Sequence, residues 1–569
     1  MLIPQKIREA IDYVQEAIVE YKGEGGVSAS IADVDINGVL LKFALVIVGF
    51  VLIKGVFMYA MRQTIIVTSR LIEYDLRNDI FNHLEKLDIG FYKRNKTGDI
   101  MARISEDVNK VRMYLGPSLL YGINLTSLFI LTITVMFKTN ATLACYTLIP
   151  LPILSLSIYL VSSRINKKST QIQEQLSTLN STAQEVYSGI RVVKSYVKES
   201  QFGKFFQAQN DEYMKQSLGL ARINAFFFPL MILLISASTL LTIFIGGIQV
   251  ANGQATPGNI AEFVIYVNML TWPVTSIGWI ASLIQQAEAS QERIEHLFAQ
   301  EPKIVNQGSV VKDINGGISF KEVEFIYPDN GIKALDKISF DLKPGDKMAI
   351  VGRTASGKST IADLLLRLYD PSSGTITIDG VALKEHDLSH LRQKIAYVPQ
   401  DVFLFSDTIK QNIAFGEEKA NDEMVKKFAS YASVHEDISG LPEGYETYIG
   451  ERGITLSGGQ KQRVSIARAL IKNPDIVILD DALSAVDMNT EQKILSYLNS
   501  VLAEKTAIII THRIYNLLNF DKIIFLEEGK IVESGNHNEL IKIGGRYAEL
   551  YEQQQAALRE SKEKSVHQG

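Results

Sequence analysis

The sequence predicts an α-helical membrane domain followed by an α/β domain. The chain has 569 residues, more than one ordinary domain holds. Hydrophobic residues make up 46% of it, and their excess lies in the first half, in stretches long enough to cross a bilayer. From about residue 318, short β-branched strands alternate with helices. We therefore divide the chain into a membrane domain (1–285), a linker (286–317), an α/β domain (318–552) and a polar tail (553–569) expected to be frayed or disordered.

Five segments of the first half are expected to span the membrane. They are roughly Val39–Met61, Ser118–Phe137, Ala141–Ser163, Phe226–Val250 and Asn259–Leu283. Lysine and arginine crowd the long polar segments after the first and third spans, whereas the connections "KTN" and "ANGQATPG" carry almost no positive charge. The positive-inside rule places both polar segments in the cytoplasm, and their helical periodicity predicts helices that continue well beyond the bilayer.

Charged residues inside or near these spans need partners. Lys42 and Lys54 lie in the first span, and Glu262 lies near the outer end of the last. Because intramembrane charges face a cavity or a partner, Glu262 is expected to be able to pair with either lysine.

The composition excludes several classes of protein. The formal net charge of −5 offers no basic field for nucleic-acid binding. Cys145 stands alone, so an intrachain disulfide is impossible, and the eight histidines show no metal-ligand spacing. The first 22 residues lack the continuous apolar core of a cleavable signal peptide, so targeting is expected to depend on internal helices.

The first motif of the α/β domain that indicates a chemical function is a phosphate-binding loop. "GRTASGKST" fits the P-loop pattern, follows the strand-like "KMAIV" and precedes the helical "IADLLLRLY". The expected nucleotide-binding residues are Gly352, Arg353, Thr354, Ala355, Ser356, Gly357, Lys358, Ser359 and Thr360. Backbone N–H groups and the helix dipole would face phosphate oxygens. Lys358 would contact the β- and γ-phosphates, and Ser359 would ligate Mg²⁺.

Two adjacent carboxylates end a buried strand in "DIVILDDALSAVD". Buried acids are unfavourable unless something pairs with them. Asp480 at the end of "IVILD" would hold the Mg²⁺ shell, and Asp481 would face the water that attacks the γ-phosphate. The alternative for Asp481 is a cap on the following helix.

A second anion cradle occurs in "LSGGQ". Ser457, Gly458, Gly459 and Gln460 lead into the helical "KQRVSIARALIKNP", so the same backbone and dipole argument applies. One chain cannot easily use two cradles on one nucleotide. The pair makes sense when a second chain completes each site.

The order of these motifs resembles the nucleotide-binding domain of ABC transporters. The P-loop is followed by Gln400 in "AYVPQD", then "LSGGQ", "ILDD", "SAVD" and His512 in "ITHR". With "DIGFYKRNKTGDIMARISEDV" and "STAQEVYSGIRVVKSYVKES" in the first half, nearly the whole chain is similar to a type IV ABC exporter half-transporter of the multidrug or lipid type.

The resemblance implies further roles. Tyr327 would stack on the adenine of ATP, and Asp487 would bridge the two ATP sites of a dimer. Gln400 would approach Mg²⁺ and the attacking water, and His512 would bind the γ-phosphate and position that water, which makes both catalytic residues together with Asp481. Ser457 and Gly459, by the same resemblance, would cradle the γ-phosphate held by the opposing chain.

The resemblance also implies the function. We expect ATP-driven export of a hydrophobic drug or lipid across the plasma (inner) membrane by alternating access, with coupling loops centred on Phe91–Ile104 and near Phe205–Tyr213. ATP sites that hydrolyse fast carry Glu where this chain has Asp481, so its own site is expected to be degenerate. A heterodimer whose partner supplies the Glu is favoured over a homodimer with two slow sites.

Three alternatives remain open from the sequence. The chain could be an ATP-gated channel or regulator, or a soluble-type ABC ATPase, although the apolar spans argue against the latter. The family has six spans per chain, and "IPQKIREAID" resembles the outer end of the first. Met1 is then an internal methionine of a longer protein, or else residues 3–21 form an amphipathic helix at the membrane surface.

Overall fold

The computed structural model describes residues 2–23, 36–450, 456–484, 486, 488–502, 504–514 and 520–566. Two compact units divide the chain. The first comprises Met1–Leu84 and Gly98–Ala299, and the second comprises Glu85–Thr97 and Gln300–Gly569. The segment Glu85–Thr97 therefore belongs to the second unit although it lies within the first half of the sequence.

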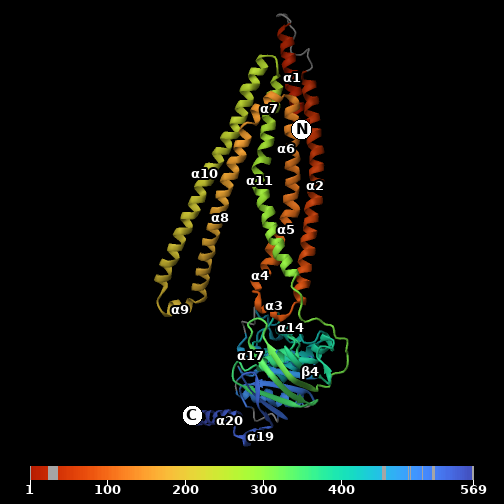
Figure 1. The fold of residues 1–569 in the computed structure, drawn as a ribbon, viewed down its shortest axis with the longest axis vertical. Coiled ribbons are helices and arrows are strands. Elements are labelled where there is room, and N and C mark those ends of the chain that lie inside the picture. The colour runs from red at the N-terminus through yellow and green to blue at the C-terminus, as the bar shows by residue number, and fades with distance from the viewer. Residues whose placement is uncertain are drawn as a thin grey trace. The chain divides into compact units, whose positions relative to one another are not determined.

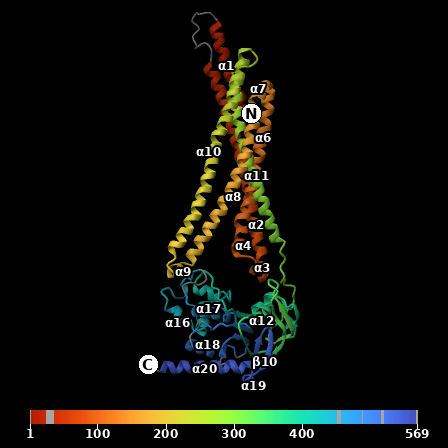
Figure 2. The same cartoon turned by 60° about the vertical axis from the view of Figure 1, so that its left-hand side comes forward.

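The first unit is entirely helical in its described residues (Figure 1). Its elements are α1 (Leu2–Gly23), α2 (Ile36–Lys86), α4 (Thr97–Ala102), η1 (Arg103–Asp107), α5 (Val108–Met113), η2 (Tyr114–Ser118), α6 (Leu119–Thr139), α7 (Ala141–Leu148), α8 (Pro150–Ser188), α9 (Ile190–Ser195), α10 (Glu199–Ala251) and α11 (Pro257–Phe298). The helices α8 and α10 lie side by side and are joined through the short α9 (Figures 1 and 2).

Five helical stretches of the described residues are long and apolar enough to cross a membrane, which agrees with the five predicted spans. They are Asn37–Lys86, Thr97–Thr139, Ala141–Ser188, Glu199–Ala251 and Pro257–Phe298, with 42 to 53 residues each. Since about 20 residues suffice to cross the hydrocarbon core, each helix extends well beyond it, as the periodicity predicted. One expectation is wrong: Phe205–Tyr213 lies within α10, and the turn between α8 and α10 is formed by Gly189–Lys198 around α9.

Polar side chains fix α1 to the beginning of α11. The guanidinium of Arg8 lies 3.0 Å from the carboxylate of Glu262, which is fully buried and also accepts a hydrogen bond from the Tyr266 hydroxyl at 2.7 Å. The Asp12 carboxylate accepts the backbone N–H of Gly258 at 2.9 Å, at the N-terminus of α11. The partner of Glu262 is therefore Arg8, and the predicted pairing with Lys42 or Lys54 is wrong. The sequence pattern could not reveal this contact, because its members are 254 residues apart.

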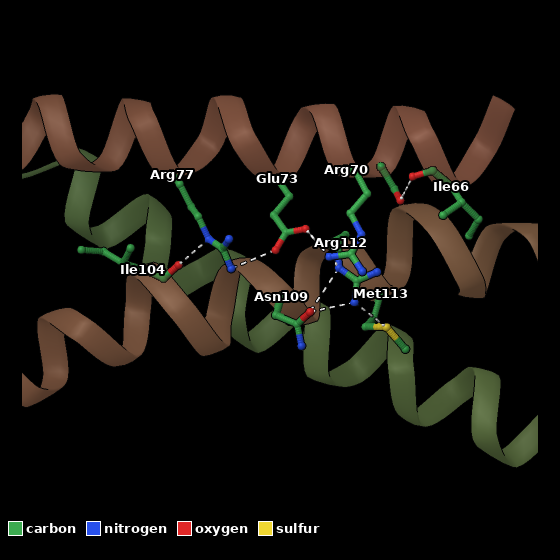
Figure 3. Close-up of polar contacts among 9 residues, drawn as sticks. Ile66, Arg70, Glu73, Arg77, Ile104, Asn109, Arg112 and Met113 are labelled. Carbon is green, nitrogen blue, oxygen red and sulfur yellow. Dashed lines mark hydrogen bonds and ion pairs between the residues drawn. The ribbon is translucent and has the colours of Figure 1, made fainter. Parts of the chain in front are cut away.

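A group of arginines surrounds one carboxylate between α2 and α5 (Figure 3). Glu73 is buried and lies 2.9 Å from Arg70, 2.8 Å from Arg77 and 3.4 Å from Arg112. Arg77 also donates to the carbonyl of Ile104 in η1, a π-helical turn. Carbonyls in such turns are partly released from helical bonding, which makes one available here. The three arginine side chains thus form ion pairs with one shared carboxylate.

The second unit contains two sheets. Its elements are α3 (Ile89–Arg94), β1 (Ile318–Ile326), β2 (Lys333–Leu342), β3 (Lys347–Gly352), α12 (Lys358–Leu365), β4 (Ser373–Ile378), β5 (Val381–Ala382), α13 (Leu388–Lys394), β6 (Ile395–Val398), α14 (Ile409–Ala414), α15 (Asp422–Tyr431), α16 (His435–Ser439), η3 (Gly444–Glu446), α17 (Gly458–Leu470), β7 (Ile476–Asp480), α18 (Met488–Val501), β8 (Thr506–Thr511), β9 (Lys522–Glu527), β10 (Lys530–Gly535), α19 (His537–Ile543) and α20 (Arg546–Val566).

The six-stranded sheet has the order β10-β9-β3-β8-β7-β6, and every pairing in it except β10 with β9 is parallel. All residues of β7 and β8 are buried, as expected for strands covered on both faces. The four-stranded antiparallel sheet has the order β2-β1-β4-β5 and shares a hydrophobic core with β3 and α12. Ligands bind at the carboxyl ends of such parallel strands, which directs attention to the residues after β3, β6, β7 and β8.

The C-terminal region differs from the expected frayed tail. Helix α20 continues to Val566, so residues 553–566 are helical. The stretch is rich in Ala, Gln, Glu and Lys, which are good helix formers, and the composition argument for disorder gave them too little weight. Tyr547 in its first turn is buried against β3 and β9 residues, so the helix starts from a fixed point.

Candidate functional site

A cavity of about 460 Å³ lies at the carboxyl ends of β3, β7 and β8. It gathers residues that are far apart in the sequence, and most were predicted. The predicted residues that line the cavity are Tyr327, Thr354, Ala355, Gly357, Lys358, Ser359, Thr360, Gln400, Asp480, Asp481 and His512. Predicted residues from four separate motifs therefore share one cavity.

The P-loop connects β3 to α12, and two of its glycines are required by close backbone contacts. A Cβ atom on Gly352 would lie 2.1 Å from the carbonyl oxygen of Leu526. Gly357 has φ +97°, and a Cβ atom there would lie 2.2 Å from the carbonyl oxygen of Ala334. Only glycine fits both positions, and the loop is thereby held so that α12 begins at Lys358 with its N–H groups toward the cavity.

Lys358 lies folded into the loop. Its ammonium donates to the carbonyl oxygens of Gly352 at 3.0 Å and Arg353 at 2.6 Å. Burial lowers the pKa of Lys358, while the nearby carboxylates of Asp480 and Asp481 act in the opposite direction. The ammonium is thus a buried cation with polar partners and, among the described residues, no carboxylate in direct contact, which suits it to meet an anion.

Asp480 ends β7 and is buried. Burial raises its pKa, the neighbouring Asp481 adds to this, and hydrogen bonds from Ser359 and Tyr397 together with the Lys358 charge oppose it. The Tyr397 hydroxyl lies 3.5 Å from the carboxylate. A divalent cation would favour the ionised form. The hydroxyl of Ser359, the carboxylate of Asp480 and the amide of Gln400 are the hard oxygen ligands that Mg²⁺ takes, with phosphates supplying others. No cluster of three or more His, Cys, Asp or Glu occurs among the described residues, so a site made by protein carboxylates alone is not found there.

Asp481 follows in the left-handed region, with φ 47°. Its backbone N–H donates to the carbonyl of Ile510 on β8 at 2.8 Å, which fixes the direction of its side chain into the cavity. The alternative that Asp481 caps the following helix is not supported, because α18 begins only at Met488. Aspartate tolerates a positive φ better than most residues do.

Tyr327 borders the cavity where the adenine was predicted to lie. Its hydroxyl lies 3.0 Å from the Thr360 hydroxyl, and burial raises its pKa, so the phenol stays neutral. The ammonium of Lys93 lies 5.0 Å from the centre of this ring and 5.1 Å from that of Tyr369. Arg94 next along pairs with Asp329 at 2.6 Å.

Asp363 was missed in the sequence, and Lys93, although it lies in the predicted coupling loop Phe91–Ile104, was not expected beside Tyr327. Burial raises the pKa of Asp363 to about 6, with Lys93 acting against this and Asp480 adding to it. Asp363 follows Ser359 by four residues on α12, and this helical spacing was a signal that could have placed it near Asp480. Lys93 gave no such signal, because more than 230 residues separate it from Tyr327.

The predicted second cradle lies elsewhere in the unit. Ser457 is the N-cap of α17, where its hydroxyl accepts from the N–H of Gln460 and the Gln460 side chain accepts from the N–H of Ser457 at 3.0 Å. Ser457 and Gly458 are exposed, and neither they nor Gly459 and Gln460 line the cavity beside Lys358. Asp487 lies outside the described residues.

Comparison with known proteins identifies the family of the chain. The family model described as the ABC transporter transmembrane region matches residues 26–274, and the one described as ABC transporter matches residues 335–484. The chain is 38% identical over 86% of its length and 84% of the relative to a Bacillus subtilis (strain 168) protein named "Probable multidrug resistance ABC transporter ATP-binding/permease protein YheI". It is 32% identical to an "ATP-dependent lipid A-core flippase" of Photobacterium profundum, over 89% of this chain and 86% of that one.

A solved structure described as a bacterial Atm1-family ABC exporter with ATP bound superposes with a TM-score of 0.75. The two chains are 26% identical, and the match covers 97% of this chain and 96% of that one.

The fold and the site thus define a P-loop ATPase fused to a helical membrane domain. The chain belongs to the ABC transporter family and has the fold of an ABC exporter, and its ATPase domain couples ATP hydrolysis to transport. The predicted fold class and family are confirmed, and the protein is an integral membrane protein.

Proposed function

We propose that this chain is one half of a heterodimeric exporter that moves a hydrophobic drug or a lipid across the plasma (inner) membrane, with its ATPase domain in the cytoplasm. The observation that carries the proposal is the separation of the two anion cradles. The exposed N-terminus of α17 at Ser457 does not border the cavity that holds Lys358. A second chain that presents its own cradle would complete each site, and closure would follow because ATP binds the closed pair more tightly.

Within each site, residues of this chain hold distinct positions. Tyr327 stacks on adenine, and the P-loop residues 352–360 bind the phosphates through backbone N–H groups and Lys358. Ser359, Gln400 and Asp480 would hold Mg²⁺, and the ion would neutralise charge on the phosphates. His512 and Gln400 position the attacking water. Asp487 is proposed to bridge the two sites.

Asp481 makes this chain's own site slow. It has the charge of glutamate but is one methylene shorter, and its backbone is fixed by the bond to Ile510. A water held about 1 Å from its productive position reacts on the order of 100-fold more slowly. In the heterodimer the partner supplies glutamate at the fast site, and Ser457 and Gly459 of this chain complete that site.

The segment Ile89–Arg94 provides a route between nucleotide and membrane helices. It is continuous in sequence with α2, and it contacts the ATPase core through Lys93 at Tyr327 and Arg94 at Asp329. Because Tyr327 also borders the nucleotide cavity, closure around ATP and the position of this segment are expected to be coupled.

The substrate class rests on the helices and on the relatives. The most apolar stretch of α2 has none of its residues buried within this chain, and that of α10 has 11%. Such faces need lipid, a second chain or an apolar substrate as cover. The name of one relative mentions multidrug resistance, and that of another mentions lipid A-core. Drugs and lipids of these kinds are hydrophobic or amphipathic.

Transport by inside-out vesicles tests the function. ATP-dependent uptake of an apolar dye or a labelled lipid is expected, and it should be lost with Lys358→Ala and on chelation of Mg²⁺. Binding and hydrolysis of ATP without uptake of any tested amphiphile would favour the alternative, a regulator that uses ATP as a ligand.

Cross-linking tests the dimer. In a Cys145→Ser background, Thr354→Cys and Ser457→Cys in one chain are expected not to cross-link two copies of it when ATP is added to a preparation that contains the partner. Efficient self-cross-linking would instead establish a homodimer. In the heterodimer, Ser457→Cys alone should cross-link, when ATP is added, to a partner that carries a cysteine in its own P-loop, and absence of that cross-link would contradict the shared ATP sites.

A further inference from the structure

A side chain of the C-terminal helix forms hydrogen bonds to the turn that carries His512. We propose that Gln554 is a positioning residue for His512, so that α20 sets the direction of the catalytic histidine. The inference rests on the proposed role of His512 in the ATP site. Its experiments include one readout that does not depend on ATP hydrolysis.

One amide bridges both ends of the turn. The Gln554 Nε2 atom donates to the carbonyl oxygen of His512 at 2.6 Å, and the Gln554 Oε1 atom accepts the backbone N–H of Ile514 at 2.9 Å. The two bonds resemble a rung of a β-ladder made by a side chain, and they fix residues 512–514 just after β8 ends at Thr511. A glutamine is suited to this task because its amide contains both a donor and an acceptor.

The helix that presents Gln554 is itself fixed. Tyr547 is 1% exposed, its hydroxyl lies 2.7 Å from the Nδ1 atom of His537, and its N–H donates to the Glu533 carboxylate at 3.1 Å. Leu550 packs against the same core cluster. Gln554 follows Tyr547 by seven residues and therefore lies on the same face of α20, two turns further on.

The turn is held from its other side by Arg513. Its guanidinium pairs with Glu491 at 2.6 Å, and its backbone N–H donates to the Thr511 hydroxyl at 2.9 Å. With both sides held, His512 lines the nucleotide cavity that also contains Lys358. It lines a second cavity of about 500 Å³ as well, between the P-loop and α20. Loss of Gln554 would release one side, and the histidine could then turn away from the phosphates.

The exchange rate of the Ile514 amide measures directly whether Gln554 holds the turn. In the full chain purified from membranes with any co-purifying subunit, and without nucleotide, Gln554→Ala should make the Ile514 amide exchange roughly 3- to 10-fold faster, because it loses its acceptor. Glu552→Ala, at an exposed position of the same helix that borders neither cavity, is the control and should leave that amide unchanged. Equal exchange in Gln554→Ala and the parent would overturn the inference. If the amides of α20 itself exchange faster in Gln554→Ala, the substitution has loosened the helix, and Gln554→Glu then decides whether Gln554 protects the Ile514 amide.

Gln554→Glu separates the two bonds. Its carboxylate can still accept from Ile514 but faces the His512 carbonyl without a donor, so the amide should stay protected while the histidine is displaced. An amide as exposed in Gln554→Glu as in Gln554→Ala would contradict the proposed geometry.

Kinetics then test the catalytic consequence. In an Asp481→Glu background, where this chain's site is expected to hydrolyse ATP fast, and with the partner's own catalytic glutamate replaced by glutamine, Gln554→Ala and Gln554→Glu should each lower kcat roughly 3- to 10-fold with little change in KM. A purely structural role would lower the amount of folded protein and leave kcat per folded molecule unchanged, and this outcome would overturn the inference. An Asp481→Glu chain without ATPase activity would contradict the proposed slow site, and hydrogen exchange would still decide the role of Gln554.

Discussion

The most informative perturbation is Asp481→Glu. Asp481 leaves β7 in the left-handed region, with φ 47°, and its N–H is fixed to Ile510 at 2.8 Å. The backbone therefore cannot follow a longer or shorter side chain, and the reach of the carboxylate is set by the number of methylenes alone. Glutamate moves the carboxylate about 1.5 Å further into the cavity, one carbon–carbon bond length.

The expected gain follows from this distance. Displacement of a reacting group by about 1 Å changes the rate on the order of 100-fold, so Asp481→Glu should raise ATP hydrolysis by this chain's site about 10- to 100-fold. Glutamate is less suited than aspartate to a positive φ, which should cost about 1 kcal/mol of stability. The variant is thus expected to be faster and slightly less stable.

The assay is steady-state ATPase activity of the heterodimer in lipid nanodiscs, with the partner's catalytic glutamate replaced by glutamine so that only this chain's site is measured, and with Lys358→Ala as the inactive reference. Asp481→Asn is the matched control, because it keeps the length of aspartate and removes the charge. It should hydrolyse no faster than the parent. Single-turnover measurements with the same proteins separate the chemical step from product release.

The refuting result is clear. If Asp481→Glu hydrolysed ATP no faster than the parent while binding it equally well, the reach of residue 481 would not limit this site. If the parent already turned over at the rate of the glutamate variant, the proposal of a degenerate site and the case for a heterodimer would both be wrong.

Three further outcomes are expected from thermal unfolding of the full chain. Because the pKa of Asp363 is raised from 3.8 to about 6, the folded state binds more protons than the unfolded state and loses stability as pH rises from about 4 to 6. Asp363→Asn should therefore be more stable than the parent above pH 6 by roughly 1 to 3 kcal/mol and equal to it near pH 4, and a pH-independent difference would contradict this cause. Glu73→Ala should lose roughly 1 to 3 kcal/mol, since it leaves Arg70, Arg77 and Arg112 without their shared acid, whereas Asp75→Ala on the exposed face of α2 should lose little. Arg8→Met should lose about 2 to 4 kcal/mol because the fully buried Glu262 loses its cation, and adding Glu262→Gln should restore most of it.

Local patterns were sufficient for much of the active site. The P-loop was recognisable because its whole pattern lies in nine consecutive residues, 352–360, between a strand-like and a helical stretch. The contacts that require glycine at Gly352 and Gly357 come from the distant carbonyls of Leu526 and Ala334 and were seen only in the structure. Asp480 was recognisable because an acid at the end of an apolar strand needs a partner. The membrane spans were visible because about twenty apolar residues in a row have few alternatives.

Contacts between distant residues were beyond such patterns. Glu262 was expected to be able to pair with a lysine of the first span and instead pairs with Arg8. The contacts of Gln554 lie in a tail whose composition suggested disorder. Neither residue differs in local sequence from many exposed polar residues. Their partners lie on other elements, and the type of a charged or amide side chain does not predict which residue it will contact.

The sequence by itself determined the fold class, the five spans, the family and the phosphate-binding motifs, because each depends on residues close together in the chain. Only the tertiary structure decided that Tyr327, Lys358, Asp480 and His512 share one cavity and that Ser457 stands outside it. The physical reason is that a parallel sheet brings the carboxyl ends of non-consecutive strands to one edge, and the order of those strands is set by packing across the whole domain.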